Sequence, residues 1–143
     1  MTRLKKRISG RLGEDFAAKY LRRNGYKILT RNYSEHHIGE IDIIAHKRDT
    51  LVFVEVKSRS SDTFGAPADA VTYDKQRKIM RTADMFGKKF VKNGFLEYTR
   101  KIWLFNIDWR CNCKNIRFDV AEVFMTPSEE LLRINYIESA FGG

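Results

Sequence analysis

Two short apolar runs, at 41–45 and 51–54, constrain the fold more than any other feature of the chain. Only a few polar residues separate them, which predicts a β-hairpin. Ile43 and Ile44 in the first run, and Val52, Phe53 and Val54 in the second, place apolar side chains on both faces of an extended strand, so both faces must be covered. We therefore expect a central sheet flanked by helices.

The hydrophobic pattern of the whole chain predicts one mixed α/β unit. Residues 11–24 form an amphipathic stretch that Gly25 ends, which predicts a helix. The other expected elements are strands at 26–33, 38–46 and 51–58 in an antiparallel meander, a loop at 60–67, a helix at 74–91, strands at 101–109 and 115–124, and a short tail at 129–140. This order, αβββαββ, places all 143 residues in a single domain with a central mixed β-sheet.

Composition and cysteine content narrow the class of protein. With 43% hydrophobic residues the chain can fill a core, and no apolar run reaches the ~18 residues of a membrane span. Residues 1–8 are charged but no apolar run follows them, so we expect no secretion signal and a cytoplasmic protein. Cys111 and Cys113 lack the spacing of a zinc site and are expected to be reduced thiols.

The net charge of +9 is unevenly distributed along the sequence. Residues 1–31 carry +8 and residues 73–101 carry +6, whereas 32–72 carry −3 and 102–143 carry −2. Basic segments around an acidic one are expected where basic arms hold a polyanion over carboxylates, and nucleic acid is the obvious polyanion. The alternative is that these charges only keep helix surfaces solvated.

A charged pair, Glu55 and Lys57, interrupts the apolar strand on one face. If the hairpin turns at 48–49, Asp42 lies opposite Glu55, and Glu40 lies opposite Lys57. Two carboxylates about 5 Å apart repel each other by roughly 3 kcal/mol at an effective dielectric constant near 20. A divalent cation with oxygen ligands, Mg²⁺ above all, would compensate this repulsion.

The alternative is a set of surface salt bridges from Asp42 and Glu55 to Lys57 and Arg59. The apolar context argues against it, because an unpaired carboxylate on a strand buried on both faces is costly. Glu14, at the edge of the first helix's apolar arc, is a possible third carboxylate, although it would equally stabilise the helix's first turn. Gln76 lies on the apolar stripe of the second helix and needs a partner, either a site group or a backbone carbonyl.

Other polar and aromatic residues give weaker signals. Adjacent residues of an extended chain point in opposite directions, so His36, His37 and also His46 are expected at the surface without forming a chelating pair. Three aromatic residues are able to stack on bases or to fill the core: Tyr73, Trp103 and Trp109. Asp119 is expected to pair with Arg117 or Lys75 and to brace the sheet, outside the site.

Several short motifs are together typical of one family. They are Gly13-Glu14, Gly25-Tyr26, Arg31-Asn32, Gly39-Glu40-Ile41-Asp42, Phe53-Val54-Glu55-Val56-Lys57 with Arg59, Lys75, and Arg117-Phe118-Asp119-Val120. On these residues the chain resembles the YraN-like family of uncharacterised bacterial proteins over nearly its whole length. That family is similar to PD-(D/E)xK nucleases, which have a restriction-endonuclease-like core, and to archaeal Holliday-junction resolvases.

The resemblance implies roles for individual residues. It implies that Asp42 and Glu55 bind Mg²⁺, with Mn²⁺ as a substitute, and that Lys57 supports the nucleophilic water. The main-chain carbonyl of Val56 would be a further ligand, and Glu14 matches the acidic residue of the resolvases' first helix. The superfamily's proline before the aspartate is Ile41 here.

Three functions compete at this stage. The first is a Mg²⁺-dependent endonuclease that acts on DNA more than on RNA, with branched or structured DNA among its expected substrates and a homodimer as one expected assembly. The second is a nucleic-acid-binding module with the same fold and an idle metal site, whose affinity would fall steeply with salt. The third, a glycoside hydrolase using two carboxylates, fits the neighbouring lysine less well. Candidate contacts to nucleic acid are Arg11, Arg59, Lys75, Gln76 and Lys78.

Overall fold

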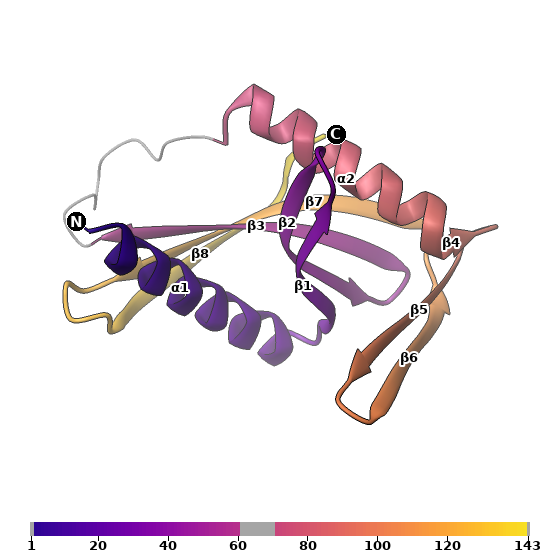
Figure 1. The fold of residues 1–143 in the computed structure, drawn as a ribbon, viewed down its shortest axis with the longest axis horizontal. Coiled ribbons are helices and arrows are strands. Elements are labelled where there is room, and N and C mark those ends of the chain that lie inside the picture. The colour runs from indigo at the N-terminus through magenta and orange to yellow at the C-terminus, as the bar shows by residue number, and fades with distance from the viewer. Residues whose placement is uncertain (1, 61–70, 143) are drawn as a thin grey trace.

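The computed structural model describes residues 2–60 and 71–142, except for the side chains of residues 5–9. Its main sheet has five strands in the order β1-β2-β3-β7-β8, and β4, β5 and β6 form a smaller sheet (Figure 1). The elements are α1 (Arg3–Arg23), β1 (Lys27–Glu35), β2 (Gly39–Lys47), β3 (Thr50–Ser60), α2 (Tyr73–Phe90), β4 (Val91–Lys92), β5 (Phe95–Ile102), β6 (Phe105–Asn112), β7 (Asn115–Met125) and β8 (Leu131–Phe141).

The sheet is mixed, as the sequence predicts. Strands β1, β2 and β3 form the expected antiparallel meander, β3 runs parallel to β7, and β7 pairs antiparallel with β8. Helix α2 and the small sheet lie in the connection between β3 and β7. The mixed α/β fold class and the order αβββαββ are confirmed in outline, and the arrangement is consistent with a nuclease-like core.

A helix covers each face of the sheet, as the two apolar runs require (Figure 1). Leu51 and Phe53 of β3 belong to the core cluster that contains α2, whereas Val52 and Val54 belong to the cluster that contains α1. Alternate side chains of β3 therefore pack into two different cores, one on each face of the sheet. Glu55, the next residue of the strand, is buried as well.

The element boundaries differ from the predictions in three places. Helix α1 begins at Arg3 and not near residue 11, because its first turns contain good helix formers but no amphipathic pattern. The segment expected as one strand at 101–109 forms parts of β5 and β6, which turn at 103–104 without the glycine or asparagine that usually marks a turn. The tail expected at 129–140 contains the edge strand β8. The sequence pattern does not predict this strand, because many of its residues are polar.

Smaller expectations have mixed outcomes. The loop expected at 60–67 lies outside the described residues, apart from Ser60 at the end of β3. The two cysteines are free thiols, as expected. The expectation that His46 lies at the surface is wrong, because this residue is buried with its Nε2 2.9 Å from the Asn112 carbonyl oxygen. No helix in the described part of the chain has the length and apolar character to cross a membrane.

The expected geometry of the adjacent histidines is also wrong. His36 and His37 do not diverge as they would in a strand, because they lie in the turn between β1 and β2, where His37 has a φ of 61°. Their ring centroids are 3.7 Å apart. Both residues are exposed, which agrees with the predicted surface position.

Candidate metal centre

The site begins where the hairpin of β2 and β3 stops pairing. The predicted register is confirmed, with paired positions running from Lys47 and Thr50 to Ile43 and Val54. Asp42 and Glu55 follow immediately beyond the last pair. The Asp42 Oδ2 atom accepts a hydrogen bond from the Val56 N–H at 2.8 Å, so a side chain takes over from the backbone ladder at this point.

Glu55 is buried, with 3% of its surface exposed, and two lysines approach it. The Lys75 Nζ of α2 lies 2.7 Å from Glu55 Oε1, and the Lys57 Nζ lies 3.9 Å from the same atom. Burial opposes the charged form of Lys75, but the hydrogen bond and charge of Glu55, with smaller contributions from Asp42 and Glu40, outweigh it and raise the pKa of Lys75. Lys75 therefore stays charged and is the main partner of Glu55.

The surroundings of Asp42 disfavour its ionised form. Burial and the charge of Glu55 raise the pKa of Asp42 to about 7, although the Val56 N–H pulls in the other direction. The charge of Glu14 adds a further, smaller increase. A divalent ion bound beside Asp42 would stabilise its ionised carboxylate, because opposite charges attract.

Glu14 lies under the sheet, but two residues of β1 hold it. Its Oε1 accepts hydrogen bonds from Arg31 Nε at 2.8 Å and from Asn32 Nδ2 at 3.1 Å, and Arg31 also contacts Asp15 at 2.6 Å. Asn32 has a φ of 53°, in the left-handed region that asparagine tolerates better than most residues. The motif pair Arg31-Asn32 was visible in the sequence, but its contact with Glu14 was not predicted.

The groups that could bind a metal ion here are few. Among residues 2–60 and 71–142, no three histidine, cysteine, aspartate or glutamate side chains gather as a metal site requires. Asp42 and Glu55 thus form a pair of carboxylates without a third acidic ligand in this part of the chain, and Arg31 and Asn32 hold Glu14 by hydrogen bonds. Carboxylate and carbonyl oxygens that leave open positions for water suit Mg²⁺, which is bound through few protein ligands.

The expected nucleic-acid contacts lie on three elements, with Arg11 on α1, Arg59 on β3, and Lys75, Gln76 and Lys78 together on α2. Gln76 donates to the Val71 carbonyl at 2.8 Å, so a backbone group is its partner, and Lys78 pairs with Asp74 at 3.2 Å. Arg59 Nε lies 3.4 Å from Glu122, not beside Glu55, and its side chain is only 13% exposed. Arg11 is exposed on α1, whereas Lys75 is engaged with Glu55.

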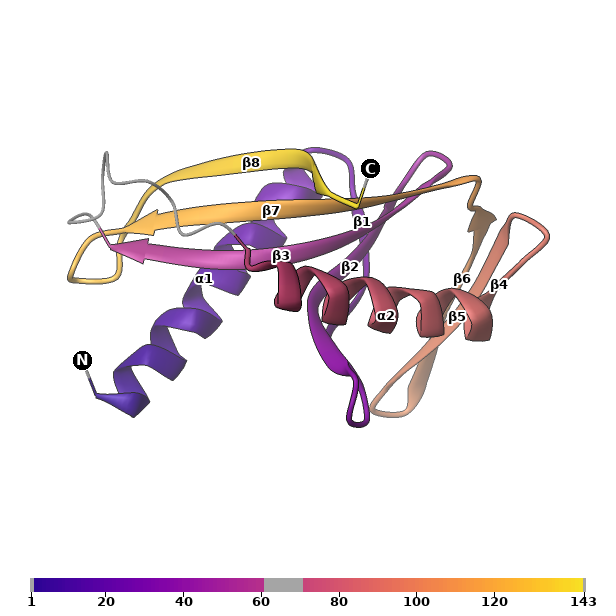
Figure 2. The same ribbon diagram turned by 90° about the horizontal axis from the view of Figure 1, so that it is seen from above.

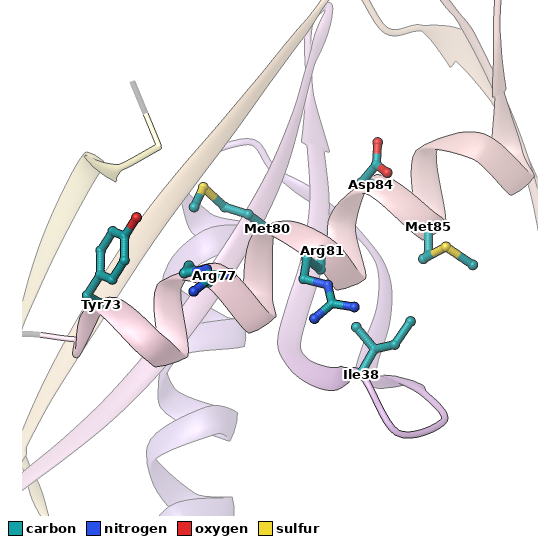
Figure 3. A pocket seen from close by; sticks show the side chains of 7 residues that line it. All are labelled: Ile38, Tyr73, Arg77, Met80, Arg81, Asp84 and Met85. Carbon is teal, nitrogen blue, oxygen red and sulfur yellow. The ribbon is translucent and has the colours of Figure 1, made fainter.

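A separate cavity of about 530 Å³ lies along α2 (Figure 3). Its lining includes Tyr73, Met80 and Met85, and Ile38 of the turn between β1 and β2 closes one side. Neither Asp42 nor Glu55 lines it. The candidate metal centre is thus defined by its charged groups and not by this cavity.

The raised pKa of Asp42 predicts a pH dependence of stability in metal-free protein. The folded state holds a proton on Asp42 up to about pH 7, whereas the unfolded chain releases it near its ordinary pKa of 3.8. The free energy of unfolding should therefore fall as pH rises from about 4 to about 7. Asp42→Asn cannot titrate and should lack this component. Urea unfolding in EDTA across this range, with both proteins, measures the difference, and identical pH profiles would contradict the assignment.

Gly13 sets how closely α1 approaches β3. A Cβ atom at this position would lie 2.0 Å from Ser58 Oγ and 3.3 Å from Ser58 Cβ. Gly13→Ala should therefore push the helix, and Glu14 with it, away from the sheet and lower the free energy of unfolding by about 1 to 3 kcal/mol. In a Ser58→Gly background the same change should cost less. Urea unfolding of the four proteins tests this coupling, and an equal cost in both backgrounds would disprove the contact.

Comparison with known proteins places the chain in a family. Residues 13–123 match the model of a family described as "Uncharacterised protein family UPF0102". A UPF0102 protein of Alkaliphilus oremlandii is 43% identical over 132 residues, which cover 92% of this chain and 96% of the relative. A UPF0102 protein of Clostridium acetobutylicum is 40% identical over 141 residues, covering 99% and 98%. The resemblance noted from the motifs is confirmed, and the chain belongs to the UPF0102, or YraN-like, family.

Proposed function

We propose that this protein is a Mg²⁺-dependent nuclease that hydrolyses phosphodiester bonds in DNA. One observation supports this most strongly: Asp42 and Glu55 lie together where β2 and β3 stop pairing, with the pKa of Asp42 raised to about 7 by burial and by the charge of Glu55. A buried carboxylate beside a half-buried one, with lysines next to them in a chain of net charge +9, suits a metal ion and a phosphate substrate.

Each residue has a proposed part in this reaction. Asp42, Glu55 and the Val56 main-chain carbonyl would hold the ion, which polarises the phosphate and lowers the pKa of a bound water. The Val56 N–H fixes the Asp42 carboxylate, and Lys75 forms an ion pair with Glu55. Lys57 lies close enough to Glu55 to orient the attacking water or to offset charge that develops on the phosphate.

DNA is the proposed substrate, ahead of RNA, and branched DNA is included. The two most basic segments of the sequence supply α1 and α2, which flank both faces of the sheet around the carboxylates. A homodimer would place two such centres on one substrate and would allow paired cuts. The proposed partner of the protein is thus a nucleic acid.

One contact favours a second candidate function, a nucleic-acid-binding module without catalysis. Lys75 Nζ is 2.7 Å from Glu55 Oε1, so a lysine already supplies part of the positive charge that a metal would bring. If Lys75 holds this position permanently, Glu55 does not reach a metal. Such a protein would bind DNA in a salt-sensitive way without cleaving it.

Cleavage assays separate the two functions. The purified protein is incubated with linear, nicked, flapped and four-way DNA and with RNA, in Mg²⁺, Mn²⁺ or EDTA. The nuclease proposal expects cleavage with either metal and none in EDTA. Binding of the panel without cleavage in any metal would support the binding module instead.

A further inference from the structure

The hairpin of β5 and β6 ends in three exposed apolar residues. Trp103 is 87% exposed, Leu104 is 86% exposed and Phe105 is 73% exposed. The hairpin lies next to the end of α2 (Figure 2), and its tip points away from the main sheet (Figure 1). Because soluble proteins rarely expose large apolar side chains together, this tip indicates an interaction surface.

The backbone of the turn at the tip of the hairpin favours glycine over the tryptophan that occupies it. Ile102 pairs with Phe105, so Trp103 and Leu104 form a two-residue turn, and Trp103 has a φ of 57°. Glycine is favoured at the first turn position when φ is positive, and a bulky aromatic residue is strained there. The chain thus carries an exposed tryptophan at a position where glycine would suit the backbone better.

The tip continues an apolar face of the hairpin toward the protein core. Leu96 is buried in the core, with Tyr98 and Trp109 packed against the same cluster. The strand pairing places Ile107 on this face as well, farther from the core, where it is 39% exposed. Arg100 lies over the Trp109 ring, 5.4 Å from its centroid.

A cavity of about 660 Å³ lies between this hairpin and the body of the protein. Ile107, Trp109 and Cys111 line it from β6, Ile28 lines it from β1, and Tyr26 lines it from the segment just before β1. Its basic lining residues are Arg22, Lys27, Lys47, Arg48 and Arg110. The charge of Lys27 acts on the thiol of Cys111, which shows that β1 and the hairpin face each other across the cavity.

One acidic residue, Asp108, also lines this groove, and Thr99 donates a hydrogen bond to it at 2.7 Å. Five basic side chains against one acidic side chain give the groove a strongly positive lining. An apolar and aromatic wall with a positive rim is the combination that binds single strands, in which phosphates meet the cations and bases stack on the rings. A second copy of this chain, with the same positive groove, would repel it.

We propose that this groove and the tip at Trp103 bind a single strand of nucleic acid. The phosphates lie along the basic rim, and an unpaired base stacks on Trp103. Lys47 of the groove is five residues from Asp42 along β2, about 16 Å at the rise of a strand. The groove is therefore a surface separate from the metal centre, and binding there requires neither metal nor cleavage, so it goes beyond the proposed nuclease activity.

The test uses fluorescence anisotropy of a labelled oligonucleotide of about 12 nucleotides, in EDTA, with DNA and RNA versions and a duplex control. Trp103→Gly should weaken single-strand binding about five- to 150-fold, the range for loss of one stacked base. Its unfolding midpoint should stay the same or rise, because glycine suits the turn. Trp103→Phe should retain most of the affinity, since the ring is kept.

A second variant tests the rim. Lys27→Gln combined with Arg110→Gln removes one exposed charge from each side of the groove. The slope of log affinity against log salt should become shallower by about 1.4, because each phosphate contact with a single strand contributes about 0.7. Lys88→Gln, near the C-terminal end of α2 and outside the lining of the groove, is the matched control and should leave the slope unchanged.

Three results would overturn the proposal. They are absence of single-strand binding by the wild type, equal affinity of the wild type and both groove variants, and loss of self-association in Trp103→Gly with unchanged oligonucleotide affinity. The last result, from sedimentation velocity, would assign the tip to an interface between copies. Because the assay contains EDTA, failure of nuclease activity does not affect its outcome, and failure here leaves the nuclease proposal intact.

Discussion

Glu55→Gln is expected to lower metal-dependent cleavage by more than about 100-fold, because loss even of a residue that only orients a metal ligand costs 10- to 100-fold. The amide keeps the size of the side chain but removes the charge that pairs with Lys75 and that a bound metal ion would need. Asp42→Asn should have a similar effect, since we propose that the two carboxylates hold one ion. Initial rates on the best substrate of the panel, in saturating Mg²⁺, measure both.

Glu40→Gln is the matched control for these variants. Glu40 lies two residues before Asp42 on β2 and is exposed, so its change removes a carboxylate near the site without touching the proposed ligands. Its cleavage rate should remain within a few-fold of the wild type. If Glu55→Gln cleaves as fast as Glu40→Gln, Glu55 is not a metal ligand.

Asp119→Ala is expected to lower the free energy of unfolding by about 3 kcal/mol or more, because it breaks a buried ion pair and leaves its partners unsatisfied. Asp119 is fully buried on β7. Its carboxylate accepts from Arg117 at 2.8 and 2.9 Å, from the Tyr136 hydroxyl at 2.5 Å and from the Ser139 N–H at 2.9 Å. The expected pairing with Arg117 is confirmed, and the network joins β7 to β8.

The pKa shifts within this network agree with an ion pair between Asp119 and Arg117. The hydrogen bond to Asp119, above all, raises the pKa of Arg117, although burial opposes it, and burial followed by the Asp119 hydrogen bond raises the pKa of the Tyr136 hydroxyl. Arg117 also donates to the Tyr26 hydroxyl at 2.6 Å, which ties β7 to the segment after α1.

Tyr136→Phe provides the control, since it removes one hydrogen bond and leaves the charge pair intact. Its expected cost is about 1 kcal/mol. Urea unfolding at neutral pH, followed by circular dichroism, gives both values. Equal stability of Asp119→Ala and Tyr136→Phe would mean that the charge pair contributes nothing beyond a single hydrogen bond.

The parts of the site that lie close in sequence were predictable. The hairpin of β2 and β3 has a two-residue turn, and a turn of fixed length determines the register, so Asp42 and Glu55 fall at adjacent positions. The burial of Glu55 followed from the apolar residues on both faces of its strand. Local pattern and strand geometry suffice for such contacts.

Contacts between distant segments were not predictable in the same way. Lys75 reaches Glu55 only because α2 crosses over the sheet, and the sequence does not give the position of a helix along a strand to within one turn. The same holds for Arg31 and Glu14, which the packing of α1 on β1 brings together. The turn at Trp103 was missed because it lacks the residues that normally mark a turn.

Isothermal titration of the metal-free protein with Mg²⁺ and Mn²⁺ tests most directly whether Asp42 and Glu55 form a divalent-cation site. The proposed site predicts saturable binding of either ion by the wild type and by Glu40→Gln, with affinity that weakens below about pH 7 as Asp42 takes up a proton. Glu55→Gln should lose this binding. Equal binding of both ions by the wild type and Glu55→Gln, or no saturable binding by the wild type, would contradict it.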